Sequence, residues 1–367
     1  MTVLDFAPFA LRPDAELSPA WLRWLGDMLR SDDDASPPPP DAPAVILPAL
    51  AAHGLAPLVY LRVRDAGAQG WPLPVLAALA EAFQASAVRS YLMAQELERV
   101  AAALAARGIP VALLKGAALG RTVYDSPAAR EVSDLDLLIP AADAEEAGRS
   151  VAALGYASHS SLGRGVFGRW QRRYRAELQM VCNIPDRQGL LIELHWSLVE
   201  LPYYIERIPM ADFWAATAPY DRLPGASIPD PAALLLHSCA HVALHHSRAL
   251  RLIWLVDVER LAKSQALAWD DLVERSERWG LGLATQATLQ AAAAWLGTPL
   301  PAGVMARLAR QADDPVGRAM WGLGDEVPGG ARRRARVTWA AFHGRQRLRY
   351  AAWMFLRALA RPFEAGR

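Results

Sequence analysis

The chain has 367 residues, more than one hydrophobic core usually fills, so we expect two or three structural units. Its formal net charge is +1, which excludes a whole-molecule field that would attract nucleic acid or an anionic membrane. The composition is 53% hydrophobic but only 8% aromatic, and much of the apolar excess is alanine. Because alanine is a strong helix former, we expect a mostly helical protein.

The two cysteines, Cys182 and Cys239, are too few for a disulfide framework and lack the spacing of metal ligands. This favours a reducing compartment. The N-terminal segment carries acidic residues and prolines where a signal peptide needs a basic start and an unbroken apolar run. No apolar stretch reaches the length of a transmembrane helix, so we expect a cytoplasmic protein without a transmembrane segment.

Residues 1–108 are predicted to form an N-terminal helical region. Residues 17–30 place tryptophan and leucine on one helix face, and a proline-rich linker follows near 31–43. The helical pattern resumes over 44–64. Residues 72–108 then predict one long helix that ends at a glycine.

Residues 109–222 change to short apolar runs and are predicted to form the core. Two strands are expected at 109–116 and 131–140, joined by a helix and a loop. Two more are expected at 172–181 and 189–198, on either side of a turn. The predicted fold class is α+β, with a small mixed β-sheet core flanked by N-terminal helices and a C-terminal helical domain.

Residues 223–367 are predicted to form that C-terminal domain, because the pattern is helical from Ile228 onward. Its tail, residues 332–367, contains ten arginines against one acidic residue, interleaved with aromatic residues. Such a tail suits peripheral contact with an anionic membrane or a nucleic acid backbone. The alternative is that its apolar face packs on the helical domain.

Two acidic residues alternate in one predicted strand. Residues two apart in a strand point to the same side, so Asp134 and Asp136 project together while Leu135 and Leu137 face the other way. The two carboxylates repel each other unless a cation lies between them, and Mg²⁺ is the usual cation at phosphoryl-transfer sites. A solvated strand edge would show the same pattern.

Glu193 is a third candidate, predicted to emerge on the same strand face as His195. Three acids suffice for two metal ions, of which one activates the attacking group and the other neutralises charge on the leaving oxygen. Glu193 would also help to remove the proton of the acceptor. The alternatives are a surface pair or a buried, hydrogen-bonded histidine.

Lys115 and Gly116 stand where a predicted strand ends and a helix begins. Free backbone N–H groups at the start of the helix would meet a triphosphate, and Lys115 and Arg121 would add positive charge. Only Lys115 and Lys263 are lysine among 39 basic residues, which indicates a need for a compact ammonium group at this turn. An ordinary turn glycine is the alternative for Gly116.

The order of these motifs resembles a known family. Residues 113–140, followed by Ala-Leu-Gly-Tyr at 153–156 and Ile-Glu-Leu-His-Trp at 192–196, resemble the bacterial family of uncharacterised nucleotidyltransferases in the polymerase-β-like superfamily. The resemblance continues into the helical segment 234–261 and spans residues 45–300.

The resemblance implies transfer of a nucleoside monophosphate from an NTP, with ATP expected, to an unidentified acceptor (a small molecule, peptide or protein), releasing pyrophosphate. It implies that Mg²⁺ or Mn²⁺ is the cofactor and that Asp134, Asp136 and Glu193 are the catalytic and metal-binding residues. The residues expected to bind the nucleotide are Lys115, Gly116, Ala117, Arg121, Arg130 and Ser133.

Two other functions stay open. Ala117 lacks the hydroxyl that many superfamily members present after the turn glycine, which leaves a catalytically degenerate nucleotide-binding or scaffold protein as one alternative. His237, His241 and His245 recur every four residues, with Asp257 expected on the next helix, so a His-based metal hydrolase is the other. Apolar neighbours favour histidines packed inside a helical bundle instead.

Overall fold

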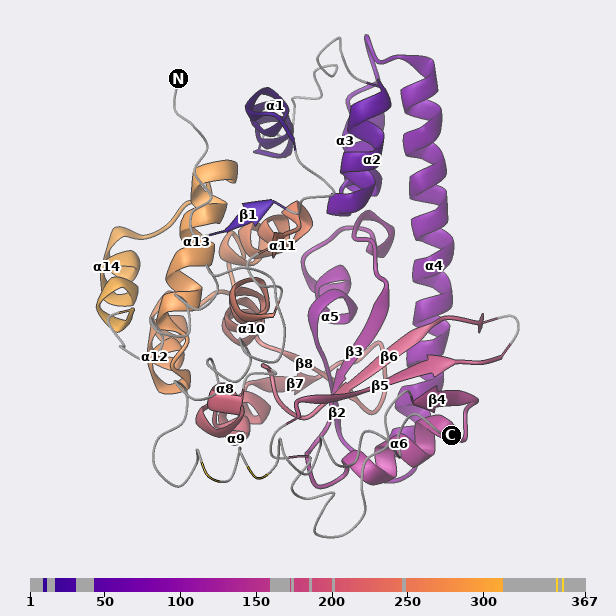
Figure 1. Cartoon of the computed structure of the whole chain (residues 1–367), viewed down its shortest axis with the longest axis vertical. Helices are drawn as coiled ribbons and strands as arrows, with labels where there is room; N and C mark the ends of the chain where they lie inside the picture. Colours follow the sequence, from indigo (N-terminus) through magenta and orange to yellow (C-terminus); the bar gives the residue numbers. More distant parts are fainter. Residues whose placement is uncertain are drawn as a thin grey trace.

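The protein is described by a computed structural model that combines helices with a mixed sheet, which confirms the predicted α+β class (Figure 1). The basic tail and the proline-rich linker fall almost wholly outside the described residues, so their predictions stay predictions. The structure describes residues 9–11, 17–30, 43–158, 172, 175–184, 187–199, 202–245, 249–312, 348 and 352.

The N-terminal region is helical as predicted, but the helix expected over 44–64 is divided in two. Gly54 has a φ of +71°, a left-handed conformation that ends one helix and starts the next at a new angle. The long helix predicted before residue 108 is confirmed and runs along one side of the molecule (Figure 1). These helices are α1 (Pro19–Arg30), α2 (Pro43–His53), α3 (Ala56–Asp65) and α4 (Leu73–Ala105).

Seven strands form one sheet in the order β4-β5-β6-β3-β2-β8-β7. Central strands β2, β3 and β6 are buried almost throughout, which is why they read as apolar runs in the sequence. The strands are β2 (Val111–Leu113), β3 (Asp134–Leu138), β4 (Tyr156–Ser158), β5 (Glu177–Cys182), β6 (Leu191–His195), β7 (Thr217–Pro219) and β8 (Ala226–Pro229).

The four predicted strands correspond to β2, β3, β5 and β6. Strands β4, β7 and β8 were not predicted, because they are short and lack the apolar run that marks β2. Strand β8 pairs in parallel with β2 at Val111↔Ala226, so helix does not begin at Ile228 as expected. The sheet thus continues past residue 222, and the domain boundaries stay a prediction.

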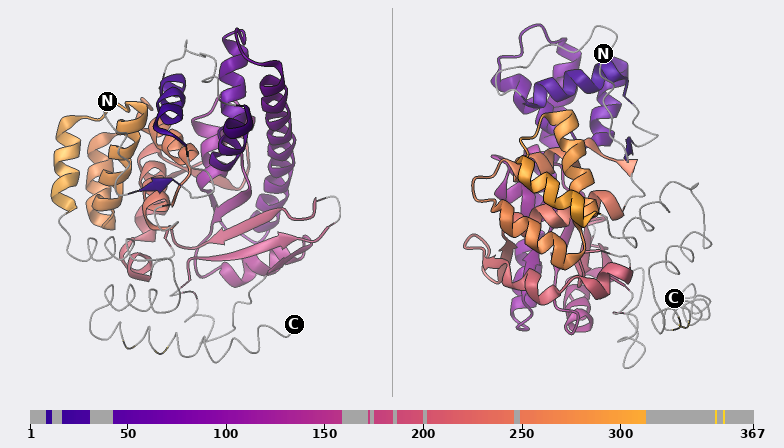
Figure 2. Two further views of the ribbon diagram at one scale, coloured as in Figure 1. Left: turned by 45° about the horizontal axis from the view of Figure 1, so that its top comes forward. Right: turned by 90° about the vertical axis from the view of Figure 1, so that its left-hand side faces the viewer.

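Helices cover the sheet from two sides (Figures 1 and 2). Helix α4 lies on one side, and a group of C-terminal helices with buried Trp279 and Trp295 lies on the other. This group comprises α10 (Pro231–Leu244), α11 (Leu252–Ala262), α12 (Trp269–Trp279), α13 (Gly282–Leu296) and α14 (Ala302–Gln311). Short elements include α5 (Lys115–Thr122), η2 (Pro127–Ala129), α6 (Ala144–Ala152), α8 (Pro202–Arg207), α9 (Met210–Ala215) and the β1 (Ala10–Leu11)–β9 (Ala249–Leu250) pair.

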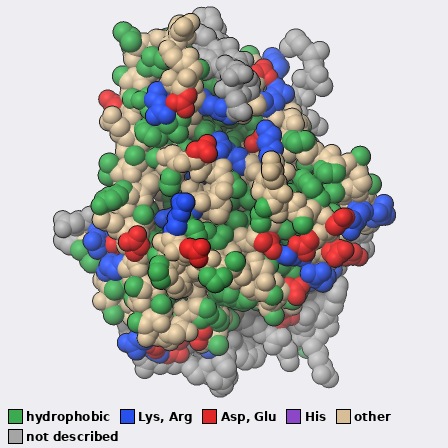
Figure 3. Space-filling view, turned by 180° about the vertical axis from the view of Figure 1, so that it is seen from behind, with side chains coloured by type: hydrophobic (Ala, Val, Ile, Leu, Met, Phe, Trp, Pro, Cys, Tyr) green, Lys and Arg blue, Asp and Glu red, His purple; other side chains and the backbone are tan. Residues whose placement is uncertain are grey.

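The surface and the helix lengths bear on membrane contact. Seen from behind, acidic and basic side chains are mixed over the surface, in keeping with a net charge of +1 (Figure 3). Among the described residues no single helix is long and apolar enough to cross a membrane. One pair of helices, Ile46–His53 and Ala56–Asp65, is long and apolar enough when the two are taken together, although a sharp bend separates them. This rests on length and composition only.

A buried ion pair joins the C-terminal helices to the loop before β3. Asp257 on α11 accepts hydrogen bonds from Arg130 Nη2 at 2.8 Å and from the Tyr124 hydroxyl at 2.6 Å. The Asp257 side chain is buried, and Arg130 also donates to the carbonyl of Glu131. This contact fixes the loop that leads into β3 against the helical layer.

Replacing Asp257 by Asn removes the charge facing Arg130 while keeping the shape of the side chain. We expect the Asp257→Asn variant to lose about 3–5 kcal/mol of the free energy of unfolding, because a buried cation is left without its carboxylate. Urea denaturation followed by circular dichroism measures this loss. The control is Glu146→Gln at an exposed pair with Arg149, which should hardly move the midpoint. Equal midpoints for wild type and Asp257→Asn would contradict the prediction.

Candidate active site

The turn between β2 and α5 places Lys115 beside the strand that carries the two aspartates. The backbone N–H of Leu114 donates to the carbonyl of Asp136 at 3.0 Å, which ties the turn to β3. Lys115 has a φ of +41°, a left-handed conformation that costs a residue with a side chain about 1–3 kcal/mol. The chain tolerates this strain where it directs an ammonium group at Asp136.

The pairing of β3 with β6 brings acidic residues from distant segments together. The strands run parallel with Asp136 opposite Glu193 and Leu138 opposite His195. On the other side of β6, antiparallel β5 places Gln179 opposite Glu193 and Glu177 opposite His195. The polar side chains of β3, β5 and β6 therefore share one face of the sheet.

Lys115 lies between the two central carboxylates. Its ammonium nitrogen is 2.6 Å from Asp136 Oδ1 and 3.4 Å from Glu193 Oε2. Burial lowers the pKa of Lys115, but the charges of Asp136 and Glu193 outweigh burial and raise it above its usual value. Lys115 is therefore a fixed positive charge at neutral pH.

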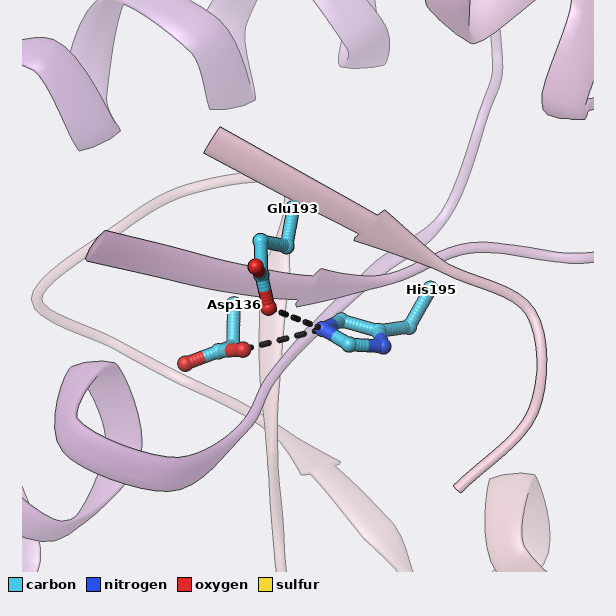
Figure 4. Close-up of side chains that lie close together, drawn as sticks. All are labelled: Asp136, Glu193 and His195. Atoms are coloured by element: carbon cyan, nitrogen blue, oxygen red, sulfur yellow. Dashed lines mark hydrogen bonds and ion pairs between the residues drawn. The ribbon is translucent and has the colours of Figure 1, made fainter. Parts of the chain in front are cut away.

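His195 is the second positive group of the cluster (Figure 4). Its Nε2 is 2.9 Å from Asp136 Oδ1 and 3.4 Å from Glu193 Oε2, and its Nδ1 is 3.2 Å from Glu177 Oε2. Burial and nearby Lys115 lower the pKa of His195, but the hydrogen bonds to Asp136 and Glu193 and the charge of Glu177 raise it to about 9. With carboxylates at both ring nitrogens, the imidazole is doubly protonated.

Asp136 is the most enclosed carboxylate of the cluster, with 1% of its surface exposed. Burial raises its pKa, but Lys115 and His195 outweigh burial and hold the pKa far below its usual range. Its Oδ1 receives both cations, whereas its buried Oδ2 has no hydrogen-bond partner among the residues that the structure describes. A buried anionic oxygen with free lone pairs is a suitable ligand for a cation.

Asp134 lies one pleat away on the same strand and is less buried than Asp136. Burial and repulsion from Asp136 and Glu193 raise the pKa of Asp134 to about 6, while Lys115 and a hydrogen bond with exposed Ser133 oppose the increase. Asp134 is outside the tightest group, in which Asp136, Glu193 and His195 present ligand atoms within 4.8 Å of one another.

The other residues predicted to bind the nucleotide differ in their burial and in their contacts. Gly116 and Ala117 are buried in the first turn of α5, and Ala117 has no exposed surface. Arg121 lies one turn further, where its Nη1 donates to the carbonyl of Ala117 at 2.9 Å. Arg130 is engaged with Asp257. The roles of these residues in nucleotide binding stay predictions.

The histidines on α10 do not form a metal centre within the described residues. The single group there that could hold a metal ion consists of Asp136, Glu193 and His195 and includes none of the α10 histidines. His237 is buried, and burial together with Lys115 and His195 lowers its pKa to about 3, so it is neutral. The structure therefore gives no support to the His-based hydrolase.

Glu177 and Gln179 take part in the cluster but were not predicted. Gln179 Nε2 donates to Glu193 Oε1 at 2.8 Å and to Glu177 Oε1 at 2.9 Å. The sequence contains a signal for them: Glu177 and Gln179 alternate with apolar residues in β5, as Asp134 and Asp136 do in β3.

The donor set fits a divalent cation. Carboxylate oxygens from Asp134, Asp136 and Glu193 share one face, and oxygen is the ligand that Mg²⁺ and Mn²⁺ prefer. The ammonium group of Lys115 already stands where positive charge is required. His195 would be a ligand only after losing a proton, so in its protonated form it orients the carboxylates.

Comparison with known proteins identifies the family of the chain. Residues 40–297 match the family described as uncharacterised nucleotidyltransferase. Since the match covers more than half of the chain, the protein belongs to this family and is a nucleotidyltransferase enzyme. No curated protein matches the chain.

A metal-binding experiment tests the carboxylate cluster directly. We expect the wild type to bind Mn²⁺ and the Asp136→Asn variant to bind it about 10–100-fold more weakly. Losing a metal ligand should lower the affinity at least as much as losing a group that only orients a ligand. Electron paramagnetic resonance measures the free ion. The control is Glu131→Gln, an exposed carboxylate just before β3. Equal Mn²⁺ affinity in wild type and Asp136→Asn would rule the cluster out as the metal site.

Proposed function

We propose that the enzyme transfers a nucleoside monophosphate from an NTP, with ATP expected, to a hydroxyl or phosphate oxygen of an acceptor. An acceptor oxygen attacks the α-phosphorus, the bond from that phosphorus to the bridging oxygen breaks, and pyrophosphate leaves. The observation that carries the proposal is the convergence of Lys115, Asp136 and Glu193 on one sheet face at the start of α5.

The triphosphate would lie at the first turn of α5. Backbone N–H groups at a helix start and the positive end of the helix attract phosphate. Because the methyl group of Ala117 is fully buried, a side-chain hydroxyl at this position would be enclosed, which favours phosphate binding through the backbone. Lys115 and the exposed hydroxyl of Ser133 would complete the phosphate contacts.

Asp134, Asp136 and Glu193 would hold two divalent cations, Mg²⁺ or Mn²⁺. When bound, such cations neutralise the charge of the phosphates and raise the reactivity of the attacking oxygen. Lys115 shares its ammonium group between Asp136 and Glu193 in the free protein, and we expect it to turn toward the phosphates when nucleotide binds.

Glu193 would accept the proton of the acceptor. Its Oε1 is held by Gln179 and its Oε2 faces Lys115 and His195, so the carboxylate is fixed in position. Proton transfer from the attacking hydroxyl to a placed carboxylate accelerates such reactions by roughly 10²–10⁴-fold. His195, held between Asp136 and Glu177, would keep Glu193 in the geometry that this transfer requires.

Nucleotide binding tests the proposal. Calorimetry with ATP, GTP, CTP and UTP in the presence of Mg²⁺ should give binding of at least one nucleotide by the wild type. We expect Asp136→Asn to abolish the part of nucleotide binding that depends on Mg²⁺, because the carboxylate that binds the cation is lost. We expect Lys115→Met to weaken binding about tenfold or more, because a charge-assisted hydrogen bond to phosphate is lost.

Glu131→Gln is the control and should bind nucleotide as the wild type does. A wild type that binds none of the four nucleotides would contradict the proposal. Undiminished Mg²⁺-dependent binding by Asp136→Asn would show that the nucleotide is held elsewhere.

A further inference from the structure

A pocket lies between α4, α5 and η2. It has a volume of about 270 Å³ and is largely apolar. It is lined by small, aromatic and methionine side chains of α4 and by residues of α5, η2 and β3. The lining residues that matter here are Ala87, Tyr91, Ala94, Gly120, Arg121 and Leu135.

The pocket is separate from the carboxylate cluster. In the described part of the chain, neither Lys115 nor any acidic residue lines it. Leu135 contributes to the pocket, and because side chains alternate along a strand, Leu135 points to the side of β3 opposite to Asp134 and Asp136. The carboxylate cluster and the pocket therefore lie on opposite faces of the same strand, and Gly116 in the first turn of α5 lines the pocket next to the proposed triphosphate site.

Among the described residues, Arg121 is the only charged residue that lines the pocket. Of its five N–H donors, one at Nη1 is used by the carbonyl of Ala117, and no carboxylate in the described part of the chain forms an ion pair with it. Burial lowers its pKa, although an arginine stays charged at neutral pH. A half-buried cation in an apolar pocket is stabilised by an anionic partner.

The opening of the pocket also suits a ligand with an apolar body. Tyr91 is 64% exposed, which is unusual for a large aromatic side chain. Ala87 and Ala94 lie on the same face of α4, two turns apart, and their small side chains leave the space that the pocket occupies.

We propose that this pocket binds a small amphipathic organic anion. The apolar body of the ligand packs between α4 and Leu135, and its carboxylate, sulfonate or phosphate group pairs with the guanidinium of Arg121. Arg121 thereby has a partner other than the triphosphate of the nucleotide, and binding of the anion does not depend on the catalytic activity.

Two fluorescent probes of similar shape test the charge requirement. 8-Anilinonaphthalene-1-sulfonate is anionic, and N-phenyl-1-naphthylamine lacks the sulfonate. We expect the wild type to bind the sulfonate with a stoichiometry of one, and Arg121→Met to weaken it about tenfold or more while leaving the neutral probe unchanged. The control is Arg89→Met, an exposed arginine of α4 that does not line the pocket and should change neither affinity.

Filling the pocket tests its location. Ala94→Phe should weaken both probes, because the ring occupies the space of the apolar body. Gly120→Val is a second filling variant: Gly120 lines the pocket, and a Cβ there would be 3.9 Å from Pro127 Cα, an ordinary contact distance. Circular dichroism identifies any variant that does not fold, and each folded filling variant should bind both probes more weakly.

Three outcomes would overturn the proposal. The first is equal binding of the sulfonate by wild type and Arg121→Met. The second is undiminished binding by a folded filling variant. The third is displacement of the sulfonate by ATP with Mg²⁺ at stoichiometric occupancy, which would assign the pocket to the nucleotide. Failure of ATP to displace the probe supports a separate site.

Discussion

The site depends on one electrostatic constraint: two carboxylates, Asp136 and Glu193, are fixed opposite each other on paired strands in a largely buried part of the sheet. Like charges in such surroundings require positive charge between them. Lys115 supplies it from a strained backbone position, and His195 supplies it as an imidazolium held by carboxylates on both sides. A divalent cation would also supply this positive charge, so the cluster that Lys115 and His195 neutralise in the free protein is suited to the proposed metal-bound state.

The remainder of the fold positions β3. The ion pair of Arg130 with Asp257 fixes the loop before this strand to the C-terminal helical layer, and the turn at Leu114 ties its centre to α5. Because side chains alternate along β3, one face serves the carboxylate cluster while Leu135 on the other face lines the pocket beside α4. One short strand thus separates the proposed chemistry from the proposed binding of an organic anion.

Much of the fold was predictable because its elements carry a clear period. Helix α4 and the four central strands show long helical patterns or compact apolar runs. The break at Gly54 was missed because apolar residues continue across it and only its left-handed backbone reveals the turn. Strands β4, β7 and β8 were missed because they are short and lack the apolar run of β2, and their strand structure depends on pairing with other strands.

The order of amino acids alone decides that Asp134 and Asp136 share a face, because alternation is a local property of a strand. It also carries the family resemblance, since the motifs and their spacing are visible without coordinates. Only the tertiary structure decides that β3 pairs in register with β6, that Arg130 faces Asp257, and that Lys115 and His195 neutralise the cluster. These contacts join segments separated by dozens of residues, and their register is set by the packing of the whole sheet and its helices rather than by any local pattern.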